Sequence, residues 1–148
     1  MNALLLLVLG SVVGGSQSPA APQESLEAVA DRFVQAWMET DTRRLEAMLR
    51  SSGIRLHLQG EDHLSLPPRQ VRAALDGLMD RSPVGEVTVT RVVPSEGDPS
   101  QGFADFLWRT GAPGGGGPIT FTLFVAFAWE GDSWQITAIR ILPSASYP

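Results

Sequence analysis

The sequence contains no cysteine and no lysine, and these two absences exclude several kinds of chemistry. Without cysteine the chain forms no disulfide, binds no metal through thiolates, carries no cysteine nucleophile and has no lipid-anchored cysteine. All eleven basic residues are arginine, so Schiff-base catalysis by lysine and a phosphate-binding P-loop lysine are also excluded.

Charge is scarce as well, because charged residues make up only 18% of the chain, and the net charge is −5. Residues 1–23 carry no charged side chain at all. Proteins that bind nucleic acids or anionic membranes do so through Lys and Arg that neutralise phosphates. We therefore expect no nucleic-acid partner, and no membrane contact beyond the N-terminal leader.

The leader is an apolar run over residues 3–13. As a helix it would rise only about 16 Å, which is short of the ~30 Å hydrocarbon core of a bilayer. Small residues follow, with cleavage positions after Ser16 or near Ala21, although no positive residue precedes the run. We predict a signal peptide over 1–16, a flexible tether over 17–23 and a secreted or periplasmic protein. The alternative is an uncleaved buried helix or strand.

The remaining residues have the length of one domain with a single hydrophobic core. Residues 25–39 place apolar side chains at helical spacing. Asp41 is expected to cap a short second helix. A third helix is expected from Pro67 to Ser82, because proline suits the first turn of a helix and a Ser-Pro pair ends one.

Five segments show the alternation or the residue types of β-strands: residues 54–59, 86–93, 102–110, 119–129 and 133–142. Gly131 and Asp132 form a two-residue turn signal between the last two segments. If this turn alone sets the register, Trp129 lies opposite Trp134 on the inner face of the sheet. Further along the same face, Leu123 then lies opposite Arg140.

The same alternation places Phe124, Ile139 and Ile141 together on the opposite face of this predicted hairpin. An apolar patch of this kind is typical of a contact between subunits. It is also the kind of surface that a terminal segment or another helix covers. A homodimer is therefore one of two expectations for this face.

Three stretches of sequence carry a likeness to a known family: FVQAWMETDTRRLEAML, SLPPRQVRAALDGLM and WEGDSWQITAIRIL. Together they resemble the nuclear transport factor 2-like superfamily, in particular its short exported members of unknown function. The resemblance covers residues 25–142. It implies an α+β cone, in which N-terminal helices pack in a curled antiparallel sheet and leave a cavity. The domain is predicted over 24–143, with a tail over 144–148.

A cavity of this kind is expected to be lined by large inward-facing side chains. The candidates for the ligand pocket are Phe33, Trp37, Phe106, Trp108, Leu123 and Arg140. The apolar set of strand 102–110 is expected inside, which puts Asp105 outside. A guanidinium inside needs an anionic partner, so we expect Arg140 to pair with Asp31 or Glu27 or to lie at the mouth of the cone in water.

The superfamily includes ketosteroid isomerases and dehydratases, which implies a cavity Asp or His as general base, with a Tyr or a protonated Asp at the oxyanion. Asp105 and His57 are the candidates for the base, but the single tyrosine, Tyr147, lies in the tail. His57 and His63 have the pattern of surface residues, and their spacing does not indicate a metal site. No cofactor is expected.

The sequence therefore favours an exported, non-catalytic domain that binds a small apolar ligand or a protein partner. Two alternatives stay open. One is an isomerase- or dehydratase-like enzyme that uses a pocket Asp or His. The other is an assembly module that forms homodimers through the outer face of its sheet.

Overall fold

The computed structural model describes residues 22–111 and 117–144 of the chain. These residues form three helices followed and interleaved by strands: α1 (Leu26–Met38), α2 (Thr42–Met48), β1 (Ile54–Leu58), β2 (Glu61–Leu66), α3 (Pro68–Arg81), β3 (Val84–Ser95), β4 (Asp98–Thr110), β5 (Ile119–Glu130) and β6 (Ser133–Pro143). The leader, the tail after residue 144 and part of the loop between β4 and β5 lie outside the described residues.

Helices α1 and α2 begin where the sequence predicts, because a capping side chain binds an amide of the first turn of each. The Ser25 hydroxyl accepts from the Ala28 amide at 3.1 Å, and the Asp41 carboxylate accepts from the Arg44 amide at 3.1 Å. Helix α3 begins with Pro68, and Pro67 is its N-cap. All three predicted helices are confirmed. None of the helices in the described part of the chain is long and apolar enough to cross a membrane.

The strands form one six-stranded sheet in the order β2-β1-β6-β5-β4-β3. The α+β class is confirmed, but the sheet is mixed rather than wholly antiparallel, because β1 pairs with β6 in parallel. Strand β2 was not predicted, since its first residues are polar and exposed. It forms because Gln59 and Gly60, with φ of 54° and 80°, turn the chain back tightly against β1.

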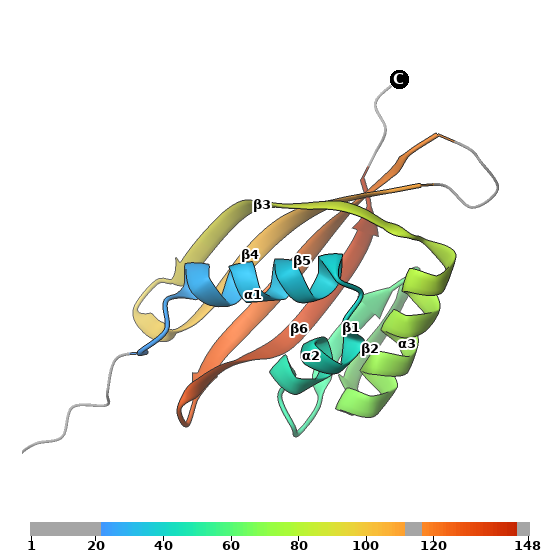
Figure 1. The fold of residues 1–148 in the computed structure, drawn as a ribbon. Helices are drawn as coiled ribbons and strands as arrows, with labels where there is room; N and C mark the ends of the chain where they lie inside the picture. Colours follow the sequence, from blue (N-terminus) through green and yellow to red (C-terminus); the bar gives the residue numbers. More distant parts are fainter. Residues whose placement is uncertain (1–21, 112–116, 145–148) are drawn as a thin grey trace, which may run out of the picture.

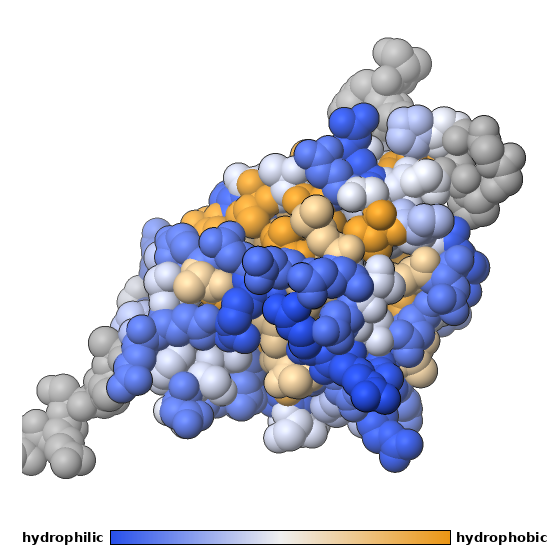
Figure 2. Space-filling model, viewed as in Figure 1, coloured by the Kyte–Doolittle hydropathy of each residue, from blue (hydrophilic) through white to orange (hydrophobic). Residues whose placement is uncertain are grey.

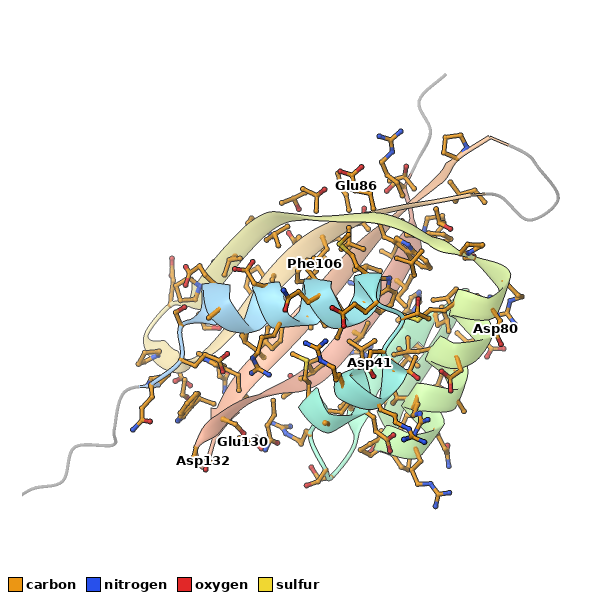
Figure 3. The ribbon with its side chains drawn as sticks, in the orientation of Figure 1. Asp41, Asp80, Glu86, Phe106, Glu130 and Asp132 are labelled. Atoms are coloured by element: carbon orange, nitrogen blue, oxygen red, sulfur yellow. The ribbon has the colours of Figure 1, made fainter. Side chains whose placement is uncertain are left out.

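The helices lie on one side of the curled sheet, and the core fills the space between them (Figure 1). Helix α1 crosses in front of the long strands, and Figure 3 labels Phe106 beside it. Figure 2 shows hydrophilic side chains over the helices and a band of hydrophobic atoms above α1 along β3. Half-buried Val84, Val89 and Val92 of β3 pack against the core there. We call the sheet face toward the helices the inner face and the opposite one the outer face.

The β5–β6 hairpin keeps its predicted register only near the turn, whose residues Glu130 and Asp132 lie at the tip in Figure 3. Trp129 lies opposite Trp134, with ring centroids 5.7 Å apart, and Phe127 lies opposite Ile136, as expected. Beyond this point β6 contains one extra residue, Thr137, so the register shifts.

The bulge at Thr137 reverses the faces of the rest of β6. Arg140 lies opposite Phe124, not Leu123, and is exposed on the outer face. Ile139 and Ile141 are 0% and 2% exposed on the inner face. The predicted inward position of Arg140 and the predicted outer cluster with both isoleucines are therefore wrong. Burying two isoleucines is favourable by about 1.5–3 kcal/mol each, whereas a buried unpaired guanidinium is costly.

Candidate functional site

Five of the six predicted pocket residues form the packed centre of the domain. Phe33, Trp37, Phe106, Trp108 and Leu123 are each 0% exposed. The rings touch in series, with centroids 4.9 Å apart for Phe33 and Phe106 and 5.3 Å apart for Trp37 and Trp108. These side chains face inward, as the sequence predicts, and they pack against one another.

Two donors inside this aromatic core have no partner. The indole Nε1–H groups of Trp37 and Trp108 are buried and make no hydrogen bond within the described residues. Each leaves a polar group without compensation, which costs roughly 1–3 kcal/mol. The two rings meet edge to face, at an interplanar angle of 77°.

The sixth candidate, Arg140, lies on the outer face in a row of residues that crosses five of the six strands, and Asp62 of β2 lies opposite His57 at its end. Register pairs connect Arg91 to Asp105, Asp105 to Phe124, Phe124 to Arg140 and Arg140 to His57. Residues paired in register share a face, so all five project outward from the sheet. The two side chains proposed as general bases, Asp105 and His57, therefore point away from the inner face.

Asp105 is the buried member of this row, with 9% of the residue exposed. Its Oδ2 accepts from the Arg91 Nε at 2.8 Å, and the Arg91 guanidinium also lies over the Phe103 ring at 5.3 Å. The other carboxylate oxygen, Oδ1, is buried and accepts no hydrogen bond in the described structure. Asp105 therefore has a buried, unsatisfied acceptor, which the sequence pattern does not indicate.

Arg140 is exposed, as Arg91 is, and no ion pair or hydrogen bond to Arg140 is found in the described parts of the chain. Asp62, on the neighbouring hairpin, is bound by Arg55 instead, with Arg55 Nε donating at 3.1 Å. That hydrogen bond holds the pKa of Asp62 below its ordinary value, with smaller contributions from the charges of Arg55, His57 and Arg140. Arg140 thus makes no direct hydrogen bond or ion pair in the described residues, and its charge acts on Asp62 only at a distance.

A hollow of about 230 Å³ lies over this row on the outer face. Its walls are mostly apolar and come from all four long strands. They consist of Arg91, Phe103, Asp105, Phe124, Val125, Ala126, Ala138 and Arg140. Phe103 is 37% exposed and Leu107, on the same face of β4, is 39% exposed. Exposed aromatic and aliphatic side chains beside unpaired charged groups are typical of binding surfaces.

Three other hollows of the described structure contain both paired and unpaired charged groups. The one of about 220 Å³ beside α1 includes Arg32 and Arg44, which bind Glu24 and Glu39. A second of about 220 Å³, beside α3, includes the Arg72–Glu46 pair. The largest, of about 280 Å³ between β1, β2 and α3, is shallow and lined largely by polar or small residues. The outer-face hollow differs from these in its mostly apolar walls.

The histidines do not form a metal site in the described residues. No group of three or more His, Asp or Glu side chains is arranged to hold an ion there. The His63 Nε2 lies 3.6 Å from the Glu61 carboxylate on the exposed strand β2. His57 lies directly opposite Arg140 on the adjacent strand. Tyr147, which could have served an oxyanion, lies outside the described residues.

The outer-face site was missed because the sequence does not reveal the bulge at Thr137. A register counted from the Gly131 turn puts Arg140 inside, on the face opposite to Asp105. The available signal was the pair Ile139 and Ile141, since only their burial satisfies the hydrophobic pattern of the C-terminal strand. The burial of both isoleucines and the register set by the Gly131 turn are compatible only if β6 contains an extra residue between them.

No family model matches the chain, and no curated protein sequence matches it. Solved structures do match in shape. A DUF4783 family protein from Bacteroides uniformis has a TM-score of 0.68 and 17% identity, covering 80% of this chain and 99% of its own. A ketosteroid isomerase-like protein from Erwinia carotovora atroseptica has a TM-score of 0.67 and 14% identity, covering 82% of this chain and 95% of its own.

A third structure, Rd1NTF2_04 with long sheet, has a TM-score of 0.63 and 15% identity, covering 79% of this chain and 99% of its own. These similarities show that the chain has the nuclear transport factor 2-like fold, as the sequence resemblance implies. At such low identity they show the fold alone, because this fold supports unrelated functions on different sites.

Proposed function

We propose that this domain of nuclear transport factor 2-like fold is an exported, non-catalytic binding domain that recognises a protein partner through the outer face of its sheet. The observation that carries the proposal is the hollow over Phe124. It has an apolar floor and an unpaired guanidinium, Arg140, on one side. On its other side lies Asp105, whose carboxylate is bound by Arg91 at 2.8 Å.

The interior gives less support to a small apolar ligand. The side chains that the sequence assigned to a pocket fill that space with each other at ring distances of 4.9–5.4 Å. A ligand there would have to displace a core aromatic residue, whose loss of packing costs about 3–5 kcal/mol. The outer face needs no such rearrangement, since Phe103 and Leu107 are already exposed to solvent.

The interior also gives little support to catalysis. A general base needs to reach the substrate, and both proposed bases, Asp105 and His57, belong to the outer row. Asp105 is engaged by Arg91 at 2.8 Å, and the shallow apolar hollow beside it does not enclose a reacting group. A surface that buries apolar area and pairs charges is the simpler use of these residues.

Export is the part of the proposal that rests on the sequence alone. The apolar run over residues 3–13 and the small residues after it fit a cleaved leader. The described domain begins close to the end of that leader. Glu24 is already fixed, because its carbonyl accepts from the Trp134 Nε1 at 2.7 Å and its carboxylate binds Arg32.

Site-specific photo-crosslinking tests the proposal. A photoreactive amino acid at Leu107 probes the outer face, and the same amino acid at Leu64 is the matched control. Leu64 is a leucine that is 74% exposed on β2, away from the hollow. Adducts with a protein in the exported fraction at position 107 and none at 64 are expected. Equal adducts at both positions, or none at 107, would reject the proposal.

A further inference from the structure

Charge is divided unequally between the two sides of this molecule. Register and exposure place four arginines on the outer face, namely Arg55, Arg91, Arg109 and Arg140. Three carboxylates share that face, those of Asp62, Glu86 and Asp105. With four positive and three negative groups the outer face carries +1, whereas the chain carries −5, so the rest of the chain carries −6. A partner that is itself acidic is therefore repelled least on the outer face.

The excess positive charge of this face belongs to Arg140. The other three arginines each lie beside one carboxylate, by hydrogen bond or in register, as the pairs Arg91–Asp105, Arg55–Asp62 and Arg109–Glu86. Arg140 makes no such pair in the described residues. A carboxylate from outside the chain is the partner that a guanidinium binds best.

The hollow over Phe124 presents positive groups to solvent and keeps its own carboxylate inside. Asp105 is 9% exposed and its Oδ1 is buried, so a group from outside does not reach that oxygen. The Arg91 side chain is 58% exposed, and only its Nε makes a hydrogen bond in the described residues. Two exposed guanidiniums, those of Arg91 and Arg140, therefore flank a mostly apolar floor.

The size of the hollow suits one side chain of a protein. Its volume is about 230 Å³, below the roughly 300–1,000 Å³ of pockets that hold drug-sized ligands. Phe103 is 37% exposed and Phe124 is half-buried, so an aromatic side chain can pack against both rings. All the described helices lie on the inner side of the sheet, so none of them covers this floor (Figure 1).

The distance between the two arginines sets a spacing for the carboxylates of an occupant. Arg91 on β3 and Arg140 on β6 belong to one row and are three strands apart, or about 14 Å at 4.8 Å per strand. An extended peptide rises about 3.3 Å per residue and turns alternate side chains to the same face. Its residues i and i+4 are then about 13 Å apart on one face, and residue i+2 lies midway, between Phe103 and Phe124.

We propose that the partner of the outer face is an acidic protein segment, which places an aromatic side chain in the hollow and binds Arg91 and Arg140 with the carboxylates on either side. This inference rests on the proposed function, because it names the chemistry of the partner for the same surface. A basic partner would bring its charges against two guanidiniums, and a second copy would bring a face of the same sign. Nucleic acid would need more excess arginines than one.

A synthetic peptide with this pattern, acetyl-Glu-Ser-Phe-Ser-Glu-amide, tests the segment. It is titrated into the isotope-labelled full chain up to about 10 mM, and the amide NMR shifts of Phe103, Leu107 and Phe124 are expected to saturate. The same peptide with both Glu replaced by Gln is expected to bind at least about fivefold more weakly, because it loses both charged contacts. The absence of saturable shifts, or equal affinities of the two peptides, would overturn the inference.

The substitution Arg140→Gln tests which guanidinium binds the carboxylate. It is expected to weaken the Glu peptide at least about threefold and to leave the Gln peptide unchanged, because the two changes remove the same contact. Arg69→Gln is the matched control, since Arg69 is an exposed arginine on α3 and its loss changes the net charge equally. Circular dichroism verifies that both variants are folded. Equal weakening by the two variants, or an equal loss for both peptides in Arg140→Gln, would overturn the contact.

The photo-crosslink at Leu107 separates failure of this inference from failure of the proposed function. With an acidic partner, Arg140→Glu is expected to reduce the adduct at least about fivefold, whereas Arg69→Glu leaves it unchanged. If the adduct persists in Arg140→Glu, the acidic segment is rejected and the binding surface stands. An adduct of twice the mass of the chain identifies a second copy and rejects the acidic segment as well. A chain without any adduct at Leu107 rejects both.

Discussion

Asp105 and Arg140 lie on the two strands that flank β5, and each lies directly opposite Phe124. One ring therefore separates an under-used carboxylate from an unpaired guanidinium on the outer face of the sheet. This relationship depends on the bulge at Thr137, because without it Arg140 would face the core. The local irregularity of β6 thus creates both the packed interior and the charged outer row.

Deleting Thr137 is expected to leave the fold intact. Without the extra residue, β6 alternates regularly after Ile136, so Arg140 stays outward and Ile139 and Ile141 stay buried. Deleting Ala138 as well reverses the faces, which exposes the two isoleucines and loses about 3–6 kcal/mol of burial. Urea denaturation followed by tryptophan fluorescence measures both variants. Thr137→Ala is the control, because it removes only a long hydrogen bond of 3.4 Å to the Ala126 carbonyl, and it should cost no more than about 1 kcal/mol. A single deletion that costs as much as the double deletion would refute the role of Thr137 as the extra residue.

Truncation of the central indole tests whether the interior is filled. Trp108→Ala is expected to reduce the free energy of unfolding by about 3–5 kcal/mol, because the ring is fully buried between Trp37 and Phe121. The new cavity is expected to bind added indole, which raises the denaturation midpoint of this variant only. Trp108→Phe serves as the conservative control and should lose less. A wild type that is stabilised by indole as strongly as the variant would mean that the interior already has room.

The pKa of Asp62 is expected to depend on Arg55. The Arg55 hydrogen bond holds this pKa below its ordinary value, so the pair stabilises the fold above the unfolded-state pKa and loses that contribution as the pH falls through the folded-state pKa. Arg55→Gln should raise the Asp62 pKa toward its ordinary value, as measured by carboxyl NMR titration. Asp98, whose pKa is lowered by Ser100, is an internal control. An Asp62 pKa that stays unchanged in the variant would show that the hydrogen bond is not formed in solution.

The leader prediction is tested by intact mass. Expression in a bacterial host should yield an exported protein that lacks the first 16 to 21 residues, as the small residues after the apolar run indicate. Cleavage there leaves Glu24 in place, so its contacts with Arg32 and Trp134 are kept. Replacing Leu5 with Arg, which interrupts the apolar run, should retain the full-length chain inside the cell. An exported protein of full-length mass would contradict the predicted cleavage.

The sequence predicts those parts of the fold that are determined locally. Ser25 and Asp41 mark the starts of α1 and α2 because capping involves groups three residues apart. The Trp129–Trp134 pairing follows from the adjacent Gly131 turn. The inward set of β4, with Phe106 and Trp108, follows from strict alternation along one strand.

What the sequence does not predict depends on contacts between distant segments. Strand β2 is polar and exposed, and only its pairing with β1 makes it a strand. The bulge at Thr137 is not marked by glycine or proline. A prediction from the local sequence therefore extends the register of the turn past it. It is favoured by the burial of Ile139 and Ile141 and by the pairing of β6 with β1 on its other edge. The outer row that crosses the sheet could not be assembled without that register.

The central claim is that a protein partner covers the outer face of the sheet in the exported fraction. The alkylation rate of a single thiol on that face tests this claim. The chain has no cysteine, so Leu107→Cys and Leu64→Cys each introduce one exposed thiol, on the outer face and on β2 respectively. Their alkylation rates are compared in the concentrated exported fraction and in the dilute purified protein. We predict that the thiol at 107 reacts at least about tenfold more slowly in the concentrated fraction, while the thiol at 64 reacts equally in both. Equal rates at 107 under the two conditions would contradict the claim.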